Sequence, residues 1–131
     1  MKLLLDTHIL LWSLLEASRL TKRVAAELEN ASNELWVSPL SVWEIITLAE
    51  KGRVILEPDP ITWIRKVFST VPLKEALLNN EIAIRSRRVA LAHKDPVDRF
   101  LAATAVVYDL TLVTADERLL RSQDFATLPN A

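Results

Sequence analysis

The order of apolar and polar residues predicts short strands separated by helices. An apolar run at residues 3–5 ends at Asp6, and a second run at residues 110–113 is followed shortly by Asp116. Apolar runs of this length, without polar alternation, are typical of strands buried on both faces. We therefore expect a strand at about residues 2–6 and another at residues 110–113, each with an aspartate near its carboxyl end.

Helical spacing and helix-start residues account for most of the remaining chain. Ser38 and Asp95 each place a capping side chain before a proline, which favours a helix start, and Gly52, the only glycine, suits a helix end. The helix after Asp95 is apolar nearly all round, so we expect it in the middle of the fold. Helices are predicted at about residues 7–16, 21–31, 39–51, 61–68, 74–92, 96–108 and 116–121, and further strands at 34–37, 70–73 and 126–128. The helix at residues 74–92 is a candidate for a break near Asn79-Asn80.

This alternation of strands and helices predicts an α/β fold with a parallel sheet covered on both faces. Pro72 favours an edge position for the strand at residues 70–73. A chain of 131 residues with 50% hydrophobic content is long enough for one domain with a sizeable core. We therefore expect a single domain over residues 1–131.

Composition excludes several other classes of protein. The formal net charge of −1 gives no sign of a protein that coats nucleic acid, and the lack of cysteine excludes disulfides and thiol chemistry. Polar residues interrupt the leucine run at the N-terminus, so we expect neither a signal peptide nor a transmembrane helix. These features indicate a cytoplasmic protein without membrane attachment.

Four acidic residues stand where a parallel sheet would bring them together: Asp6, Glu44, Asp98 and Asp116. Asp6 and Asp116 follow strands, and Asp98 opens the most apolar helix. Helix capping or the helix dipole would explain each aspartate taken alone. Glu44 lies too deep in its helix to act as a cap, and its alternative interpretation is a surface glutamate on a mixed helix face. Because the carboxyl ends of parallel strands share one edge, we expect a common acidic cleft there.

Carboxylates in one cleft repel one another, and a divalent cation relieves that repulsion. Oxygen ligands without cysteine select Mg²⁺ or Mn²⁺. Zinc is not expected at His8 or His93, because the chain has no helical histidine pair. Such a site suits phosphoryl chemistry, in which the cation activates water and stabilises the leaving oxygen.

Four segments resemble the acidic motifs of PIN-domain ribonucleases, above all the VapC-type toxins of toxin–antitoxin pairs. They are Leu5-Asp6-Thr7-His8, Ser41-Val42-Trp43-Glu44-Ile45, Asp95-Pro96-Val97-Asp98-Arg99 and Leu112-Val113-Thr114-Ala115-Asp116. Each motif alone is unspecific, but all four occur in order across the whole chain. The resemblance implies a three-layer α/β/α sandwich with a short, mostly parallel sheet, Mg²⁺ or Mn²⁺, and endonucleolytic cleavage of RNA by metal-activated water. It also implies a small cognate antitoxin as partner and a homodimer.

The resemblance gives four residues a catalytic role at the metal: Asp6, Glu44, Asp98 and Asp116. It gives Thr114 a supporting role, which Thr7 shares by its position after Asp6. Arg99 is a candidate contact for substrate phosphate or an ion-pair partner. Asp95 is interpreted as a helix cap.

Other conspicuous residues have two interpretations. The basic run Arg85, Arg87, Arg88 and Lys94 is either a solvated helix face or a track for RNA phosphates. We expect Trp12 and Trp43 to pack in the core, and Trp63 is a candidate for contact with a partner protein.

Three alternative functions are weighed against a nuclease. A haloacid dehalogenase-type phosphatase needs a second aspartate two residues after the first, where this chain has His8. A response-regulator receiver needs a lysine on a late strand, and none follows Thr114 suitably. The non-enzymatic alternative is a catalytically silent PIN-like module that binds RNA or protein.

Overall fold

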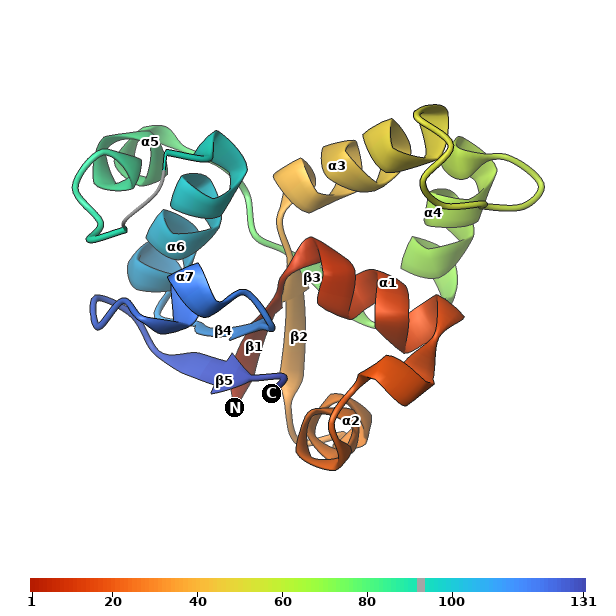
Figure 1. Cartoon of the computed structure of the whole chain (residues 1–131), viewed down its shortest axis with the longest axis horizontal. Coiled ribbons are helices and arrows are strands. Elements are labelled where there is room, and N and C mark those ends of the chain that lie inside the picture. The colour runs from red at the N-terminus through yellow and green to blue at the C-terminus, as the bar shows by residue number, and fades with distance from the viewer. Residues whose placement is uncertain (92–93) are drawn as a thin grey trace.

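The computed structural model describes residues 1–91 and 94–131. It contains a parallel sheet of five strands in the order β3-β2-β1-β4-β5, with helices on both sides (Figure 1). This arrangement confirms the predicted α/β/α sandwich. The strands are β1 Lys2–Leu5, β2 Glu34–Val37, β3 Leu73–Glu75, β4 Thr111–Thr114 and β5 Thr127–Pro129.

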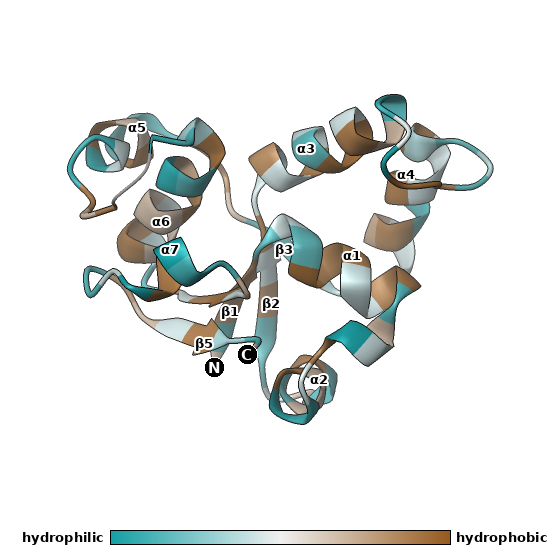
Figure 2. Ribbon diagram, in the orientation of Figure 1, coloured by the Kyte–Doolittle hydropathy of each residue, from teal (hydrophilic) through white to brown (hydrophobic). Residues whose placement is uncertain are grey.

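The helices form two layers. Helices α1 to α4 lie on one side of the sheet, and α5 to α7 lie on the other (Figure 1). Their bounds are α1 Thr7–Leu15, α2 Lys22–Glu29, α3 Pro39–Glu50, α4 Pro60–Thr70, α5 Asn80–Ser86, α6 Pro96–Tyr108 and α7 Glu117–Leu120, with a short 3-10 helix at Ala17–Arg19. Helices α1 and α3 each carry both hydrophobic and hydrophilic residues, as expected for helices with one face on a core (Figure 2).

Strand β1 supplies side chains to both cores. Leu3 and Leu5 belong to the cluster formed with α1 to α4, whereas Leu4 belongs to the cluster formed with α6 and α7. All three are at most 1% exposed. Burying each leucine stabilises the fold by about 1.5–3 kcal/mol relative to leaving it in water. The prediction of a first strand buried on both faces is therefore confirmed, and Asp6 follows it at a fixed place.

Several predicted boundaries agree with the structure. Helix α6 occupies the predicted residues, Pro96–Tyr108, and its buried side chains lie in the middle of the second layer. Gly52 has a φ of 72°, a left-handed conformation that favours glycine after a helix. None of the helices within residues 1–91 and 94–131 combines the length and the apolar character needed to span a bilayer.

The prediction was wrong in the region around β3. The third strand is Leu73–Glu75 rather than residues 70–73, and the helix predicted at residues 74–92 is reduced to Asn80–Ser86. Pairing with β2 at the sheet edge overrides the helical preference of this segment, and Lys74 pairs with Glu34 of β2 at 3.3 Å. The predicted helix end at position 92 lies outside the described residues.

The prediction for one tryptophan was also wrong. Trp43 was expected in the core, but 59% of its surface is exposed, because it lies on the outer side of α3. Helical spacing alone did not show which side of α3 meets the sheet. Trp63 is partly buried against the core that α1 to α4 form, and its contact with a partner protein stays a prediction.

Candidate active site

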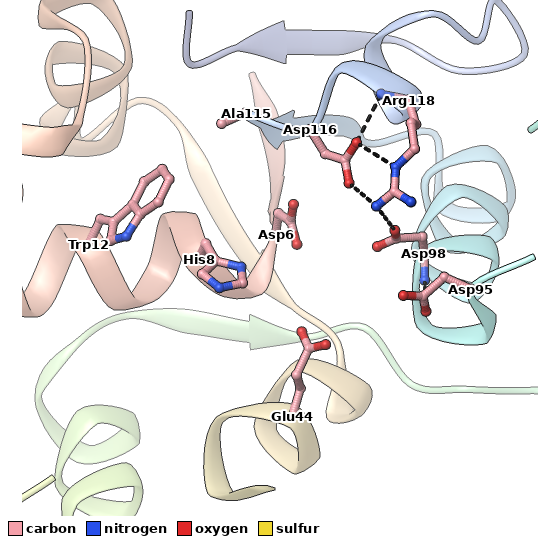
Figure 3. A pocket seen from close by; sticks show the side chains of 9 residues that line it. All are labelled: Asp6, His8, Trp12, Glu44, Asp95, Asp98, Ala115, Asp116 and Arg118. Atoms are coloured by element: carbon pink, nitrogen blue, oxygen red, sulfur yellow. Dashed lines mark hydrogen bonds and ion pairs between the residues drawn. The ribbon is translucent and has the colours of Figure 1, made fainter. Parts of the chain in front are cut away.

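A pocket of about 390 Å³ lies where β1 and β4 end, and it brings the four predicted acidic residues together (Figure 3). Each comes from a different element: Asp6 follows β1, Glu44 lies in α3, Asp98 lies in the first turn of α6, and Asp116 precedes α7. The lining also includes Asp95, His8, Trp12, Ala115 and Arg118.

Asp6 is held by hydrogen bonds to both oxygens of its carboxylate. The Thr114 hydroxyl donates to Oδ2 at 2.7 Å, and the backbone N–H of Thr7 donates to Oδ1 at 2.7 Å. The residue is only 9% exposed. Burial raises the pKa of Asp6 above its ordinary value, although these two hydrogen bonds lower it and the nearby charge of Glu44 raises it further. Asp6 therefore caps α1 and also presents a rigid carboxylate to the pocket.

Thr7 and Ser41 connect the starts of α1 and α3. The Thr7 hydroxyl donates to the Ser41 hydroxyl at 3.0 Å, and both residues are fully buried. Glu44 follows Ser41 by three residues, so this bond fixes the part of α3 that carries Glu44 toward Asp6. The role of Ser41 was missed from sequence, although a serine one turn before the glutamate on the same helix face was the available signal.

Thr114 also contacts the backbone of the segment that carries Asp116. The backbone N–H of Asp116 donates to the Thr114 hydroxyl at 3.0 Å, and Asp116 in turn caps α7 by accepting from the Arg118 N–H at 2.8 Å. One hydroxyl thus connects Asp6 to the loop that carries Asp116. The structure thus places Thr114 between two of the predicted acids, and its supporting role stays a prediction.

The pKa of Asp98, like that of Asp6, is raised in the pocket. Its side chain is 14% exposed. Burial, followed by the negative charges of Asp6, Asp95 and Asp116, raises its pKa to about 7, against the lowering effect of Arg118. Asp95 caps α6 as predicted, with its carboxylate accepting from the Val97 N–H at 2.9 Å. Because Asp95 also lines the pocket, it adds to the repulsion that Asp98 experiences.

Arg118 was missed by the sequence analysis and is the only lysine or arginine among the described residues that line the pocket. Its Nη2 lies 3.0 Å from Asp116 Oδ2 and 4.0 Å from Asp98 Oδ2, and its Nε lies 3.3 Å from Asp116 Oδ1. These contacts raise the pKa of the guanidinium group. A basic residue two positions after the last motif acid was the signal in the sequence.

The chemistry of the pocket fits a hard divalent cation. Its potential ligands are carboxylate oxygens, which suit Mg²⁺ or Mn²⁺, and burial together with repulsion from the neighbouring aspartates raises the pKa of Asp98. In this conformation the acids stand on separate walls, and no three acidic or histidine side chains within residues 1–91 and 94–131 form a complete ligand set (Figure 3). A cation would therefore have to draw them closer together.

Arg99, the candidate phosphate contact, is not among the residues that line the pocket. Its Nε donates to the Ser86 carbonyl at 2.8 Å, and its Nη2 donates to the Val89 carbonyl at 3.1 Å. It therefore ties the end of α5 to α6. Of the basic run, Arg85 pairs with Glu81 at 3.1 Å, and Arg85 and Arg88 line a separate pocket.

Replacing Arg99 by alanine is expected to lower the free energy of unfolding by about 2 kcal/mol, because the hydrogen bonds to two carbonyls come from a charged donor. Urea unfolding measures the change. Arg85→Ala is the matched control, since an exposed i,i+4 ion pair contributes only about 0.5 kcal/mol. Equal effects of the two substitutions would contradict the structural role given to Arg99.

Comparisons with known proteins agree with this geometry. The PIN domain family matches residues 3–125. Ribonuclease VapC22 of Mycobacterium tuberculosis is 32% identical over 119 residues, which are 88% of each chain. Among solved structures, DNA-bound VapBC from Salmonella typhimurium matches with a TM-score of 0.73 and 20% identity over 100% of this chain and 99% of that chain. VapBC2 from Rickettsia felis, bound to a promoter DNA fragment, matches with a TM-score of 0.72 and 14% identity over 98% of each chain.

Proposed function

The chain belongs to the PIN-domain family, and from this premise we propose that it is a metal-dependent endoribonuclease that acts as the toxin of a toxin–antitoxin pair. The observation that carries this proposal is the shared pocket of Asp6, Glu44, Asp98 and Asp116. Four carboxylates contributed by separate elements are costly to gather in one place unless a cation is bound there.

Mg²⁺ or Mn²⁺ would be held by these four acids. When bound, the cation supplies a water of lowered pKa and charge stabilisation at the leaving oxygen. Other residues of the chain hold these acids in position. Thr114 and the Thr7 N–H hold the Asp6 carboxylate, and the Thr7–Ser41 bond fixes the helix that carries Glu44. Because these supports are buried, Asp6 and the helix that carries Glu44 would keep their positions when a cation and RNA bind.

The proposed partners are RNA and a small cognate antitoxin, and the proposed assembly is a homodimer in the cytoplasm. Support comes from the relative named as a ribonuclease and from the likeness in fold to toxin–antitoxin complexes. The alternative of a catalytically silent RNA- or protein-binding module is less favoured. It would have no need to keep the four acids and the Thr114 hydroxyl aimed at one pocket.

The test is cleavage of a mixed RNA pool by the purified full chain. We expect cleavage with Mg²⁺ or Mn²⁺, loss of cleavage in EDTA, and recovery when the ion is restored in excess. The Asp6→Asn variant, purified in the same way, controls for contaminating ribonuclease. Cleavage that persists in EDTA or in the variant would overturn the metal-dependent mechanism, and no cleavage under any condition would favour the silent module.

A further inference from the structure

The guanidinium group of Arg118 lies beside two carboxylates of the acidic pocket. It lies between Asp116 and Asp98, with Nη2 at 3.0 Å from one carboxylate and 4.0 Å from the other (Figure 3). These two carboxylates come from different elements, so the contact bridges two walls of the pocket.

The surroundings distinguish this contact from an ordinary surface ion pair. The Arg118 side chain is 52% exposed, whereas those of Asp98 and Asp116 are 14% and 25% exposed. The charges of Asp6 and Asp95 also act on this part of the pocket. By contrast, Arg121 of the same segment pairs at 3.7 Å with Glu117, which is 84% exposed, and neither residue lines the pocket.

We propose that Arg118 is a built-in counter-cation that competes with a divalent metal ion for Asp98 and Asp116 and thereby sets the metal affinity of the site. This inference rests on the proposed metal dependence. Arg118 is a positioning residue here: it neutralises the carboxylates while the metal is absent, and it leaves Asp98 when the metal binds.

Two features make this exchange possible. A guanidinium group has no lone pair with which to bind a metal, and its charge repels a divalent cation. The guanidinium group and the cation therefore weaken each other's binding to the same carboxylate oxygens. The backbone N–H of Arg118 separately donates to Asp116 Oδ1 at 2.8 Å. The cap of α7 and the place of Asp116 are therefore kept when the Arg118 side chain turns toward solvent.

The experiment is calorimetric titration of the EDTA-treated, dialysed full chain with MgCl₂ and, separately, MnCl₂. Arg118→Gln removes the charge, Arg118→Lys keeps it without the planar fork, and Arg121→Gln is the matched control that removes one charge from the same segment. At low salt we expect Arg118→Gln to bind both ions about two- to fivefold more tightly than the natural chain. The lysine variant should stay close to the natural chain, as should the control.

Salt and thermal unfolding give second readouts. The difference between Arg118→Gln and the natural chain should shrink at about 0.5 M KCl, because salt screens the competition. In EDTA, Arg118→Gln should melt at a lower temperature than Arg121→Gln, because the acids lose their counter-cation. These melting curves also show that the variant is folded.

The results separate this inference from the proposed function. If the natural chain binds the ions but Arg118→Gln binds them no more tightly, or more weakly, the inference is overturned and the metal-dependent nuclease stands. If the folded natural chain binds neither ion, both are overturned. If the natural chain binds the ions without cleaving RNA and Arg118→Gln binds them more tightly, the inference stands and the nuclease function fails.

Discussion

Asp98→Asn is expected to lower RNA cleavage by more than about 100-fold and to stabilise the metal-free protein at pH 8. The loss of cleavage follows from removing a proposed metal ligand, since even residues behind the ligands typically contribute 10- to 100-fold. The gain in stability follows from the pKa of Asp98, which burial and three neighbouring aspartates raise to about 7. Asparagine keeps the shape of the protonated side chain and removes the repelled charge.

The sign of the pH dependence is fixed by that raised pKa. In the unfolded chain Asp98 ionises near pH 4, whereas in the folded, metal-free protein it ionises near pH 7. The folded state therefore holds the extra proton between these values, and its stability falls as the pH rises through this window. Asparagine does not ionise, so the Asp98→Asn variant does not lose this stability as the pH rises. We expect its melting temperature to exceed that of the natural chain by about 3 °C or more at pH 8 and by nothing at pH 4.

Thermal unfolding in EDTA at several pH values measures this prediction. Glu117→Gln is the control, because Glu117 is an acid of the neighbouring segment whose side chain is 84% exposed. It should change neither cleavage nor the pH dependence of melting. If Asp98→Asn instead destabilises the protein strongly at every pH, then the main role of Asp98 is to interact with the positive end of α6.

Thr114→Val should have the second largest effect. Valine has nearly the same shape as threonine but cannot donate to Asp6 Oδ2 or accept from the Asp116 N–H, two bonds of 2.7 and 3.0 Å. An unsatisfied buried polar group costs about 1–3 kcal/mol, so the free energy of unfolding should fall by this amount at pH 7. RNA cleavage should fall by about 10- to 100-fold, because Asp6 is no longer oriented.

Thr114→Ser is the matched control for this substitution. Serine keeps the hydroxyl and loses only a methyl group, so we expect cleavage within a few-fold of the natural chain. The Thr114 hydroxyl lowers the pKa of Asp6, so its loss penalises ionised Asp6 and the valine variant should lose more stability at pH 8 than at pH 4. Equal cleavage by the valine and serine variants would show that the hydroxyl does not support the site.

The elements that were predicted correctly are those whose signals are local. The run of three buried leucines identifies β1, and a capping residue before proline identifies the starts of α3 and α6. Strand β3 was misplaced because it has only three residues and exists through pairing with β2 at the sheet edge. The segment's own preference, which points to helix, carries no information about that partner.

The acids of the site were predictable because strand ends in a parallel sheet converge on one edge. The residues that support these acids were harder to predict. The bond between Thr7 and Ser41 depends on how closely α1 approaches α3, and the position of Arg118 depends on the distance from α7 to α6. Such distances follow from packing between the layers of the fold. The spacing of apolar and polar residues along a single sequence does not reveal this packing. The exposure of Trp43 was missed for the same reason.

Asp6 and the residue that orients it are 108 positions apart in the chain. Strand β1 leaves the ribosome long before its neighbour β4, which is translated only after residue 110, although β1 lies in the middle of the sheet. Contacts between such distant segments form late in folding. A nascent chain therefore carries an unfinished sheet and no assembled site, and translation that stops before β4 yields a fragment without nuclease activity. The order of the strands thus delays assembly of the site until β4 has been made.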